Sequence, residues 1–150
     1  MGSSHRRLAA ALAAAWEAEV TAAERMIALS EQTPLPHVRA RLLVHAAFCR
    51  AHASRLMTRL SSQGRGPLPV PAPPSESPPT GAEALLLEAR LAQDAAIRYR
   101  ASTALARARG DLSTAWVCEM NAGEEADRGA ELELLARELL QADLQGPVAV

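Results

Sequence analysis

The stretch from Gly64 to Thr80, GRGPLPVPAPPSESPPT, separates two long blocks of helix-forming sequence. Proline fixes φ and lacks a backbone N–H, so a segment this rich in proline favours an extended linker over a helix or a central strand. The blocks on either side are dominated by alanine and leucine, which have high helix propensity. We therefore expect two helical units joined by a linker over residues 62–80, within one domain of 150 residues.

Each block contains one short break. Thr33–Pro36, TPLP, interrupts the first block and Gly110 interrupts the second, because proline disfavours continued helix and glycine favours a helix end. The expected helices are therefore residues 6–31, 37–61, 81–109 and 112–143. Two short connections around one long connection predict an all-α four-helix bundle, made of two helical hairpins joined by a proline-rich crossover.

Two of the predicted helices have capping signals at their starts. Thr80 and Glu83 have the spacing of a capping box at the start of the third helix, and Asp111 or Ser113 can cap the fourth.

The composition argues against several classes of protein. The chain has 16 basic and 17 acidic residues and a formal charge of -1, so no strong net field attracts nucleic acid or an anionic membrane. Glu17 and Glu19 interrupt the apolar run near the N-terminus, which argues against a membrane span. Cys49 and Cys118 lie in separate predicted helices without metal-type spacing. A reducing, cytoplasmic location is therefore expected.

The first predicted helix has two possible inward faces. One seam places Glu19 on the inward face and consists of Leu12, Trp16, Glu19, Ala23 and Met26. A slightly rotated seam leaves Glu19 at its edge and consists of Ala9, Ala13, Trp16, Val20, Ala23 and Ile27. Since a buried carboxylate without a partner is unfavourable, both rotations stay open.

The second predicted helix shows the same ambiguity. One stripe would point a His-x3-Cys-x2-His set to one side, and it consists of Val38, Leu42, His45, Cys49, His52 and Leu56. The rotated stripe is apolar, with both histidines beside it, and it consists of Val38, Leu42, Ala46, Cys49, Ala53, Leu56 and Leu60. In the second reading Cys49 is a small buried hydrophobic residue.

The third and fourth predicted helices each place acidic residues near apolar or small ones. In the third, the stripe formed by Leu87, Leu91, Asp94, Ala101 and Leu105 would turn Asp94 inward. In the fourth, Gly123, Ala126 and Ala130 form a strip of small residues that predicts close helix approach.

A weak internal repeat relates the two predicted hairpins. When the hairpins are aligned so that Glu19 matches Asp94, and one residue is inserted at the turn, Cys49 matches Glu125 and His52 matches Arg128.

This sequence pattern resembles that of the ferritin-like superfamily, especially its small bacterial members related to rubrerythrin and the YciF-type stress proteins. The segments that carry the resemblance are residues 23–56, AERMIALSEQTPLPHVRARLLVHAAFCRAHASRL, and 93–136, QDAAIRYRASTALARARGDLSTAWVCEMNAGEEADRGAELELLA. In those bundles helices 1 and 3 each supply one glutamate, and helices 2 and 4 each supply Glu-x-x-His, to hold two iron or manganese ions.

Carried over by position, the resemblance implies a set of site residues. Glu19, with Glu17 as an alternative, stands for the carboxylate of helix 1, and Asp94 stands for that of helix 3. Cys49-x-x-His52 and Glu125-x-x-Arg128 occupy the places of the two Glu-x-x-His motifs.

Two departures from the family pattern predict that a standard di-iron site is absent. Cys49 cannot bridge two metals as a carboxylate does, and Arg128 brings its own positive charge. In one hypothesis the bundle is metal-free, and Arg128 pairs with Glu19, Asp94 or Glu125. In the other, a single iron, zinc or manganese ion is held by Glu19, His52 and either Cys49 or His45.

The two hypotheses predict different functions. The metal-free hypothesis predicts a structural, stress-associated or interaction protein that self-associates through its helix faces. The metal hypothesis predicts an altered iron or zinc protein and, if it is an enzyme, an iron-dependent oxidoreductase. The sequence singles out no catalytic residue and no further cofactor in either case.

Overall fold

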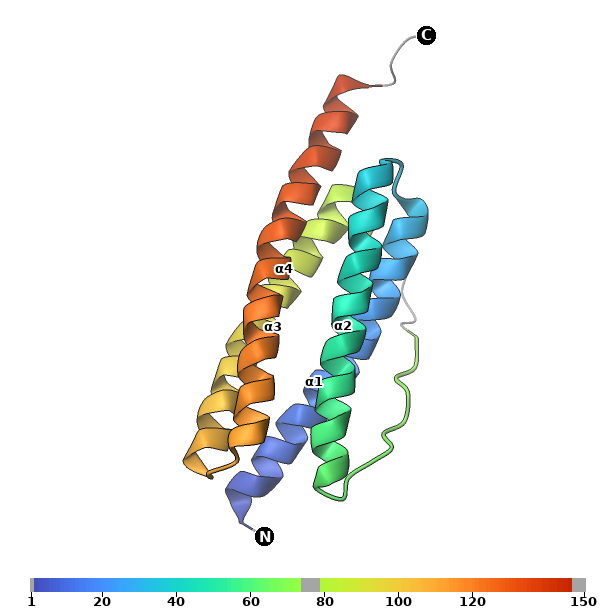
Figure 1. Ribbon diagram of the computed structural model, residues 1–150. Coiled ribbons are helices and arrows are strands. Elements are labelled where there is room, and N and C mark those ends of the chain that lie inside the picture. Colours follow the sequence, from blue (N-terminus) through green and yellow to red (C-terminus); the bar gives the residue numbers. More distant parts are fainter. Residues whose placement is uncertain (1, 74–78, 147–150) are drawn as a thin grey trace.

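The computed structural model, which describes residues 2–73 and 79–146, confirms the all-α four-helix bundle of two hairpins (Figure 1). Its helices are α1 (Ser3–Gln32), α2 (Pro36–Ser62), α3 (Gly81–Ala108) and α4 (Leu112–Gln145). Residues 63–73 and 79–80 of the predicted linker contain no helix, and residues 74–78 lie outside the described part of the chain. The helix boundaries differ from the predicted ones by only a few residues.

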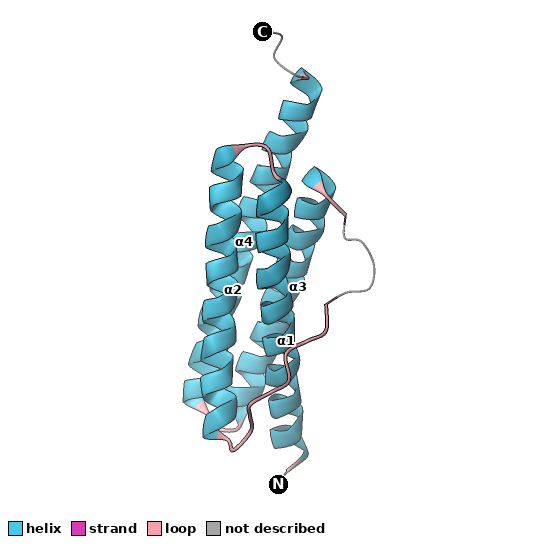
Figure 2. Ribbon diagram, turned by 90° about the vertical axis from the view of Figure 1, so that its right-hand side faces the viewer, coloured by secondary structure: helices cyan, strands magenta, loops and turns pink. Residues whose placement is uncertain are grey.

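Contact is most extensive within the hairpins, α1 with α2 and α3 with α4. The described part of the linker after α2, residues 63–73, runs along the outside of the bundle, and α3 starts at the end opposite to the end of α2 (Figure 2). The hairpins meet along two antiparallel seams, which we call the α1–α3 seam and the α2–α4 seam. Arg109 near the end of α3 bonds to Ser4 near the start of α1, and His37 near the start of α2 contacts Glu138 near the end of α4.

The turn signals account for most of the helix ends. Pro36 opens α2, and Gly110 follows α3 with a φ of 74°, a left-handed conformation that favours glycine. Asp111 caps α4 as expected, because its carboxylate accepts a hydrogen bond from the Thr114 amide at 3.1 Å. The capping box predicted at Thr80 is wrong, since the Thr80 side chain makes no cap bond. Gly81, the first residue of α3, has a left-handed φ of 66°, which differs from the backbone geometry that a capping box requires.

The hairpin of α3 and α4 is tightly packed at Gly129. A Cβ atom at this position would lie 3.0 Å from Gln93 Cγ and 3.2 Å from the Ala89 carbonyl oxygen, which leaves little room for a side chain. The strip predicted to give close approach, Gly123, Ala126 and Ala130, does not do so. Gly123 and Ala130 are exposed, because α4 turns a neighbouring set of residues toward α3.

The interior face predicted for α3 is also wrong. Asp94 and most of its predicted companions, including Leu87, Leu91 and Ala101, are exposed. The buried face instead consists of Ala82, Ala84, Leu85, Glu88, Ala89, Ala92, Ala96, Tyr99, Thr103 and Ala106. Alanine fills this face because a short side chain lets α3 approach α4, and the larger leucines then remain on the rim.

The core has two apolar ends with a more polar middle. At one end Met26, Leu42, Leu85 and Leu132 pack together, and at the other Leu8, Leu12, Leu56 and Leu60 do so. Between them the apolar packing shrinks to Ala22, Ala23 and Cys49. This middle level is where the charged interior residues lie. Over the described ranges, no helix is long and apolar enough to cross a membrane.

Candidate metal centre

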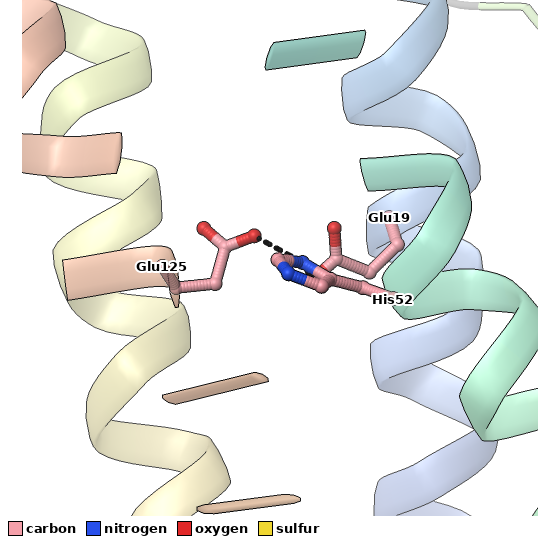
Figure 3. A group of neighbouring side chains, drawn as sticks. All are labelled: Glu19, His52 and Glu125. Atoms are coloured by element: carbon pink, nitrogen blue, oxygen red, sulfur yellow. Dashed lines mark hydrogen bonds and ion pairs between the residues drawn. The ribbon is translucent and has the colours of Figure 1, made fainter. Parts of the chain in front are cut away.

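Three potential metal ligands from three helices meet in the middle of the bundle. Glu19 comes from α1, His52 from α2 and Glu125 from α4, and their ligand atoms all lie within 4.8 Å of one another (Figure 3). His52 Nδ1 is 3.2 Å from Glu19 Oε1 and 3.0 Å from Glu125 Oε1. Each residue is at most 4% exposed. The ligand atoms are therefore close enough to share one ion, and the three side chains are almost fully buried.

The rotation of α1 explains why Glu19 reaches this position. The seam that includes Glu19 faces the interior, since Leu12, Ala23 and Met26 are buried with it and Trp16 is half-buried. Glu17, the alternative carboxylate, is exposed. On α2 the buried face is wide enough to contain both predicted stripes, so His45 and His52 are buried together with Ala46 and Ala53.

The second ring nitrogen of His52 is held by a further carboxylate. His52 Nε2 lies 2.6 Å from Glu124 Oε2, and Arg55 NH1 donates to the same oxygen at 3.0 Å. Arg55 NH1 also donates to Asn121 Oδ1 at 3.1 Å. An imidazole that donates to a carboxylate from one nitrogen presents the other to a metal, as is usual for histidine ligands. Glu124 thus orients Nδ1 of His52 toward Glu19 and Glu125.

Hydrogen bonds and burial change the proton affinity of this cluster. Burial alone would lower the pKa of His52, but its hydrogen bonds with Glu125 and Glu19 raise that pKa to about 9. Burial raises the pKa of Glu19, although its hydrogen bond with His52 opposes the shift. The pKa of Glu125 is lowered, because His52 and Arg128 outweigh the effect of burial. Without a metal, His52 therefore carries the proton between the two carboxylates.

One carboxylate oxygen in the cluster is left without a partner. Tyr99 on α3 donates its hydroxyl proton to Glu19 Oε1 at 2.8 Å. Glu19 Oε2 is buried and makes no hydrogen bond with any described residue. Buried carboxylate oxygens nearly always have a hydrogen-bond or metal partner. The free oxygen therefore indicates a position that can accept a cation.

Arg128 lies on the α4 side of this cluster. Its NH1 donates to both oxygens of Glu125, at 2.8 and 2.7 Å, and its Nε donates to His45 Nδ1 at 3.1 Å. Of the three carboxylates considered for Arg128, the structure pairs it with Glu125. Because a guanidinium only donates, His45 Nδ1 must be unprotonated. Burial and the charge of Arg128 accordingly lower the pKa of His45 to about 4.

The remaining predicted ligands stay outside the group of three. Cys49 is fully buried beside Ala22 and Ala23, and burial raises the pKa of its thiol, which disfavours the thiolate that binds metals. Asp94 lies on the exposed side of α3, so the structure does not bring it to the centre. The helix 3 residue that reaches the centre is Tyr99. A signal for it exists in the sequence, since Ala92, Ala96 and Tyr99 follow helical spacing.

The donor set suits one borderline divalent ion. Zinc bonds to imidazole nitrogen and carboxylate oxygen are near 2.0–2.2 Å, which places two donors of one ion roughly 3 to 3.5 Å apart. The distances from His52 Nδ1 to the two carboxylates fit that spacing. A second ion beside Glu125 is disfavoured, because Arg128 already supplies positive charge to that carboxylate. The residues therefore fit a mononuclear centre and do not fit a dinuclear one.

Comparison with known proteins adds information on the fold. No protein-family model matches the chain, and no curated protein matches it in sequence. A crystal structure of a protein from Xanthomonas campestris pv. campestris is similar, with a TM-score of 0.83 and 19% identity. The match covers 96% of this chain and 97% of that chain. At this identity the likeness shows a shared four-helix fold and nothing further.

Proposed function

We propose that the protein is a ferritin-like bundle that binds one divalent transition-metal ion, zinc, ferrous iron or manganese, through Glu19, His52 and Glu125. The observation that carries the proposal is the meeting of these three buried donors from three helices, within 4.8 Å. The unpartnered Glu19 Oε2 and the Glu124 carboxylate behind His52 support it. The family relationship rests on the order of the helices and on the positions of these donors.

Each residue around the ion has a distinct task in this proposal. Glu19 and Glu125 supply oxygen donors and negative charge, and His52 supplies the nitrogen donor. Glu124 fixes the orientation of the His52 ring, and Tyr99 holds one oxygen of Glu19 in place. When bound, a zinc ion would act as a Lewis acid, and an iron ion could also exchange electrons, which is the basis for an oxidoreductase.

A metal-free structural or stress-associated bundle is the second candidate, and a specific observation favours it. Glu19 and Glu125 are matched in charge by a protonated His52 and by Arg128. This network already pairs both buried carboxylates, so the core can exist without an ion. In that case the function lies on the surface of the helices, where Leu43 and Phe48 of α2 are partly exposed.

The setting of the protein is part of the same proposal. We infer a reducing cytoplasm, because Cys49 and Cys118 are separate, buried thiols. We also infer self-association through helix faces, and no binding to nucleic acid, given the near balance of charge. Sedimentation analysis of the purified chain tests the self-association.

The deciding experiment measures metal content after incubation with Fe(II), Mn(II) or Zn(II) and desalting. Wild type is compared with His52→Ala, and His37→Ala is the matched control because His37 is an exposed histidine on the same helix. The proposal expects about one ion per chain in wild type and His37→Ala, and none in His52→Ala. Two ions per chain would contradict the mononuclear centre, and no ion in wild type would favour the metal-free bundle.

A further inference from the structure

The α1–α3 seam contains grooves that reach the candidate centre. One groove, of about 450 Å³, is lined by Glu19, Glu125 and Arg128, and a second, of about 720 Å³, is lined by Glu19 and Tyr99. Ala14 and Ala18 of α1 line both grooves, and alanine makes up most of the wall of the larger one. The smaller groove also has four charged residues outside the centre, whose formal charges balance: Glu17, Arg25, Glu88 and Arg98. Small side chains along this seam therefore leave an approach from the surface to Glu19.

The opposite side of the centre is closed. On the α2–α4 seam, His52 Nε2 is occupied by Glu124, and Arg55 joins Glu124 to Asn121. Three protein donors do not complete the coordination of zinc or iron, which take at least four ligands. A further ligand from solution would therefore reach the ion through the α1–α3 grooves.

The charges around the centre select the kind of ligand. With a divalent ion in place, Glu19 and Glu125 contribute two negative charges, and Arg128 adds one positive charge. His52 is neutral when its Nδ1 binds the ion, and Glu124 is paired with Arg55. The loaded centre thus has a formal charge of about +1, and in a buried setting one negative charge would neutralise it.

We propose that the metal-loaded centre binds a small monovalent anion, which enters through the α1–α3 grooves and completes the coordination of the ion beside Arg128. This inference rests on the proposed metal site. The step is ligand binding, in which the anion donates an electron pair to the metal and no electron is transferred. The groove that contains Arg128 has room for an anion of a few atoms, such as formate or azide.

The test is titration of the Co(II)-loaded protein with azide, followed by the visible absorption of the cobalt ion. Wild type should give a saturable spectral change. Ala18→Leu fills the groove and should weaken azide binding at least tenfold, whereas Ala47→Leu should have no effect because Ala47 is an exposed residue on α2. Arg128→Gln should also weaken azide binding about tenfold, and Arg128→Lys should retain most of it.

The outcomes separate this inference from the proposed function. If Co(II) binds and azide causes no spectral change, the anion site is refuted while the metal site stands. Equal azide binding in Ala18→Leu and wild type would refute the route through the α1–α3 grooves. A chain that takes up no Co(II) refutes the metal site itself, and the anion site with it. Circular dichroism and Co(II) content of each variant establish that the fold and the loaded centre are intact.

Discussion

The two seams that join the hairpins differ in their chemistry. Polar pairs run along the α2–α4 seam, and they are His37–Glu138, Arg41–Glu131, Arg55–Glu124 and Arg59–Asp111. The α1–α3 seam contains Arg25–Glu88, and alanine lines much of its remaining length. Long charged side chains fill the first seam, whereas alanine is too short to fill the second. One fold thus gives the candidate centre a closed side and an open side.

Arg128 connects the two sides, and its removal should have the largest effect. It lines a groove of the α1–α3 seam and donates to His45 on α2. Arg128→Met would leave Glu125 buried without its guanidinium partner, which typically destabilises a protein by about 3 to 5 kcal/mol. Urea unfolding of the metal-free protein measures the change.

Arg128→Lys is the control for this substitution, since it keeps the charge and should lose less stability. An unchanged melting temperature for Arg128→Met would show that the pairing across the interior contributes little. The stability of the bundle would then come from its apolar ends and the two seams.

The α2–α4 seam should also make stability depend on pH. His45 must stay neutral to accept from Arg128, so its pKa is about 4 in the folded protein and near 6.5 in the unfolded chain. Between these values the unfolded chain binds more protons, and stability falls as the pH falls. We expect a loss of about 2 kcal/mol between pH 7 and pH 5. Denaturant unfolding at several pH values measures it.

Two observations separate His45 from the other titrating groups. His45→Gln should lose much less stability over this range, because glutamine keeps an acceptor and does not titrate. His52 acts in the opposite direction, because its pKa is raised to about 9, so its stabilisation increases as the pH falls from 7 to 5 and is lost as the pH rises toward 9. The comparison with His45→Gln removes this contribution, since His52 titrates in both proteins. Equal pH profiles for wild type and His45→Gln would rule out His45 as the source.

The smallest effect is expected for a single surface pair of the α2–α4 seam. Arg41 and Glu131 are both partly exposed, so Arg41→Met should reduce stability by less than about 1 kcal/mol, and less still at high salt.

Arg25→Met is the matched substitution in the α1–α3 seam. It should reduce stability by about 1 to 3 kcal/mol, because the Glu88 side chain is only 5% exposed and loses its partner. Thermal unfolding at two salt concentrations measures both, and a larger effect at Arg41 would reverse the expected order.

Local signals in the sequence were sufficient to predict the fold. The proline-rich linker, the break at Pro34 to Pro36 and Gly110 each act within a few residues, and they located four helices. The capping box at Thr80 failed because Gly81, the first residue of α3, has a left-handed φ of 66°, and the Thr80 side chain makes no cap bond. The backbone geometry at the start of α3 depends on how the linker enters the helix, and the spacing of Thr80 and Glu83 carries no information about that.

The candidate site was less predictable than the fold, since it depends on helix rotation. Glu19, His52 and Glu125 were identified by position, but Asp94 was placed inward on a stripe of leucines that proved to be exposed. A pattern built on large apolar residues is misleading in a helix that packs through alanine. Glu124 was not predicted as a partner of His52, because that contact forms only when the two hairpins dock.

The division of the candidate ligands between the hairpins has a mechanical consequence. Glu19 and His52 belong to the first hairpin and Glu125 to the second, while the linker is the covalent tether between them. An ion held by all three residues would act as a reversible cross-link midway along the bundle. The stability of the contact between the two hairpins would then increase with the free concentration of the ion. Chelation of the ion would weaken that contact and leave the packing within each hairpin unchanged.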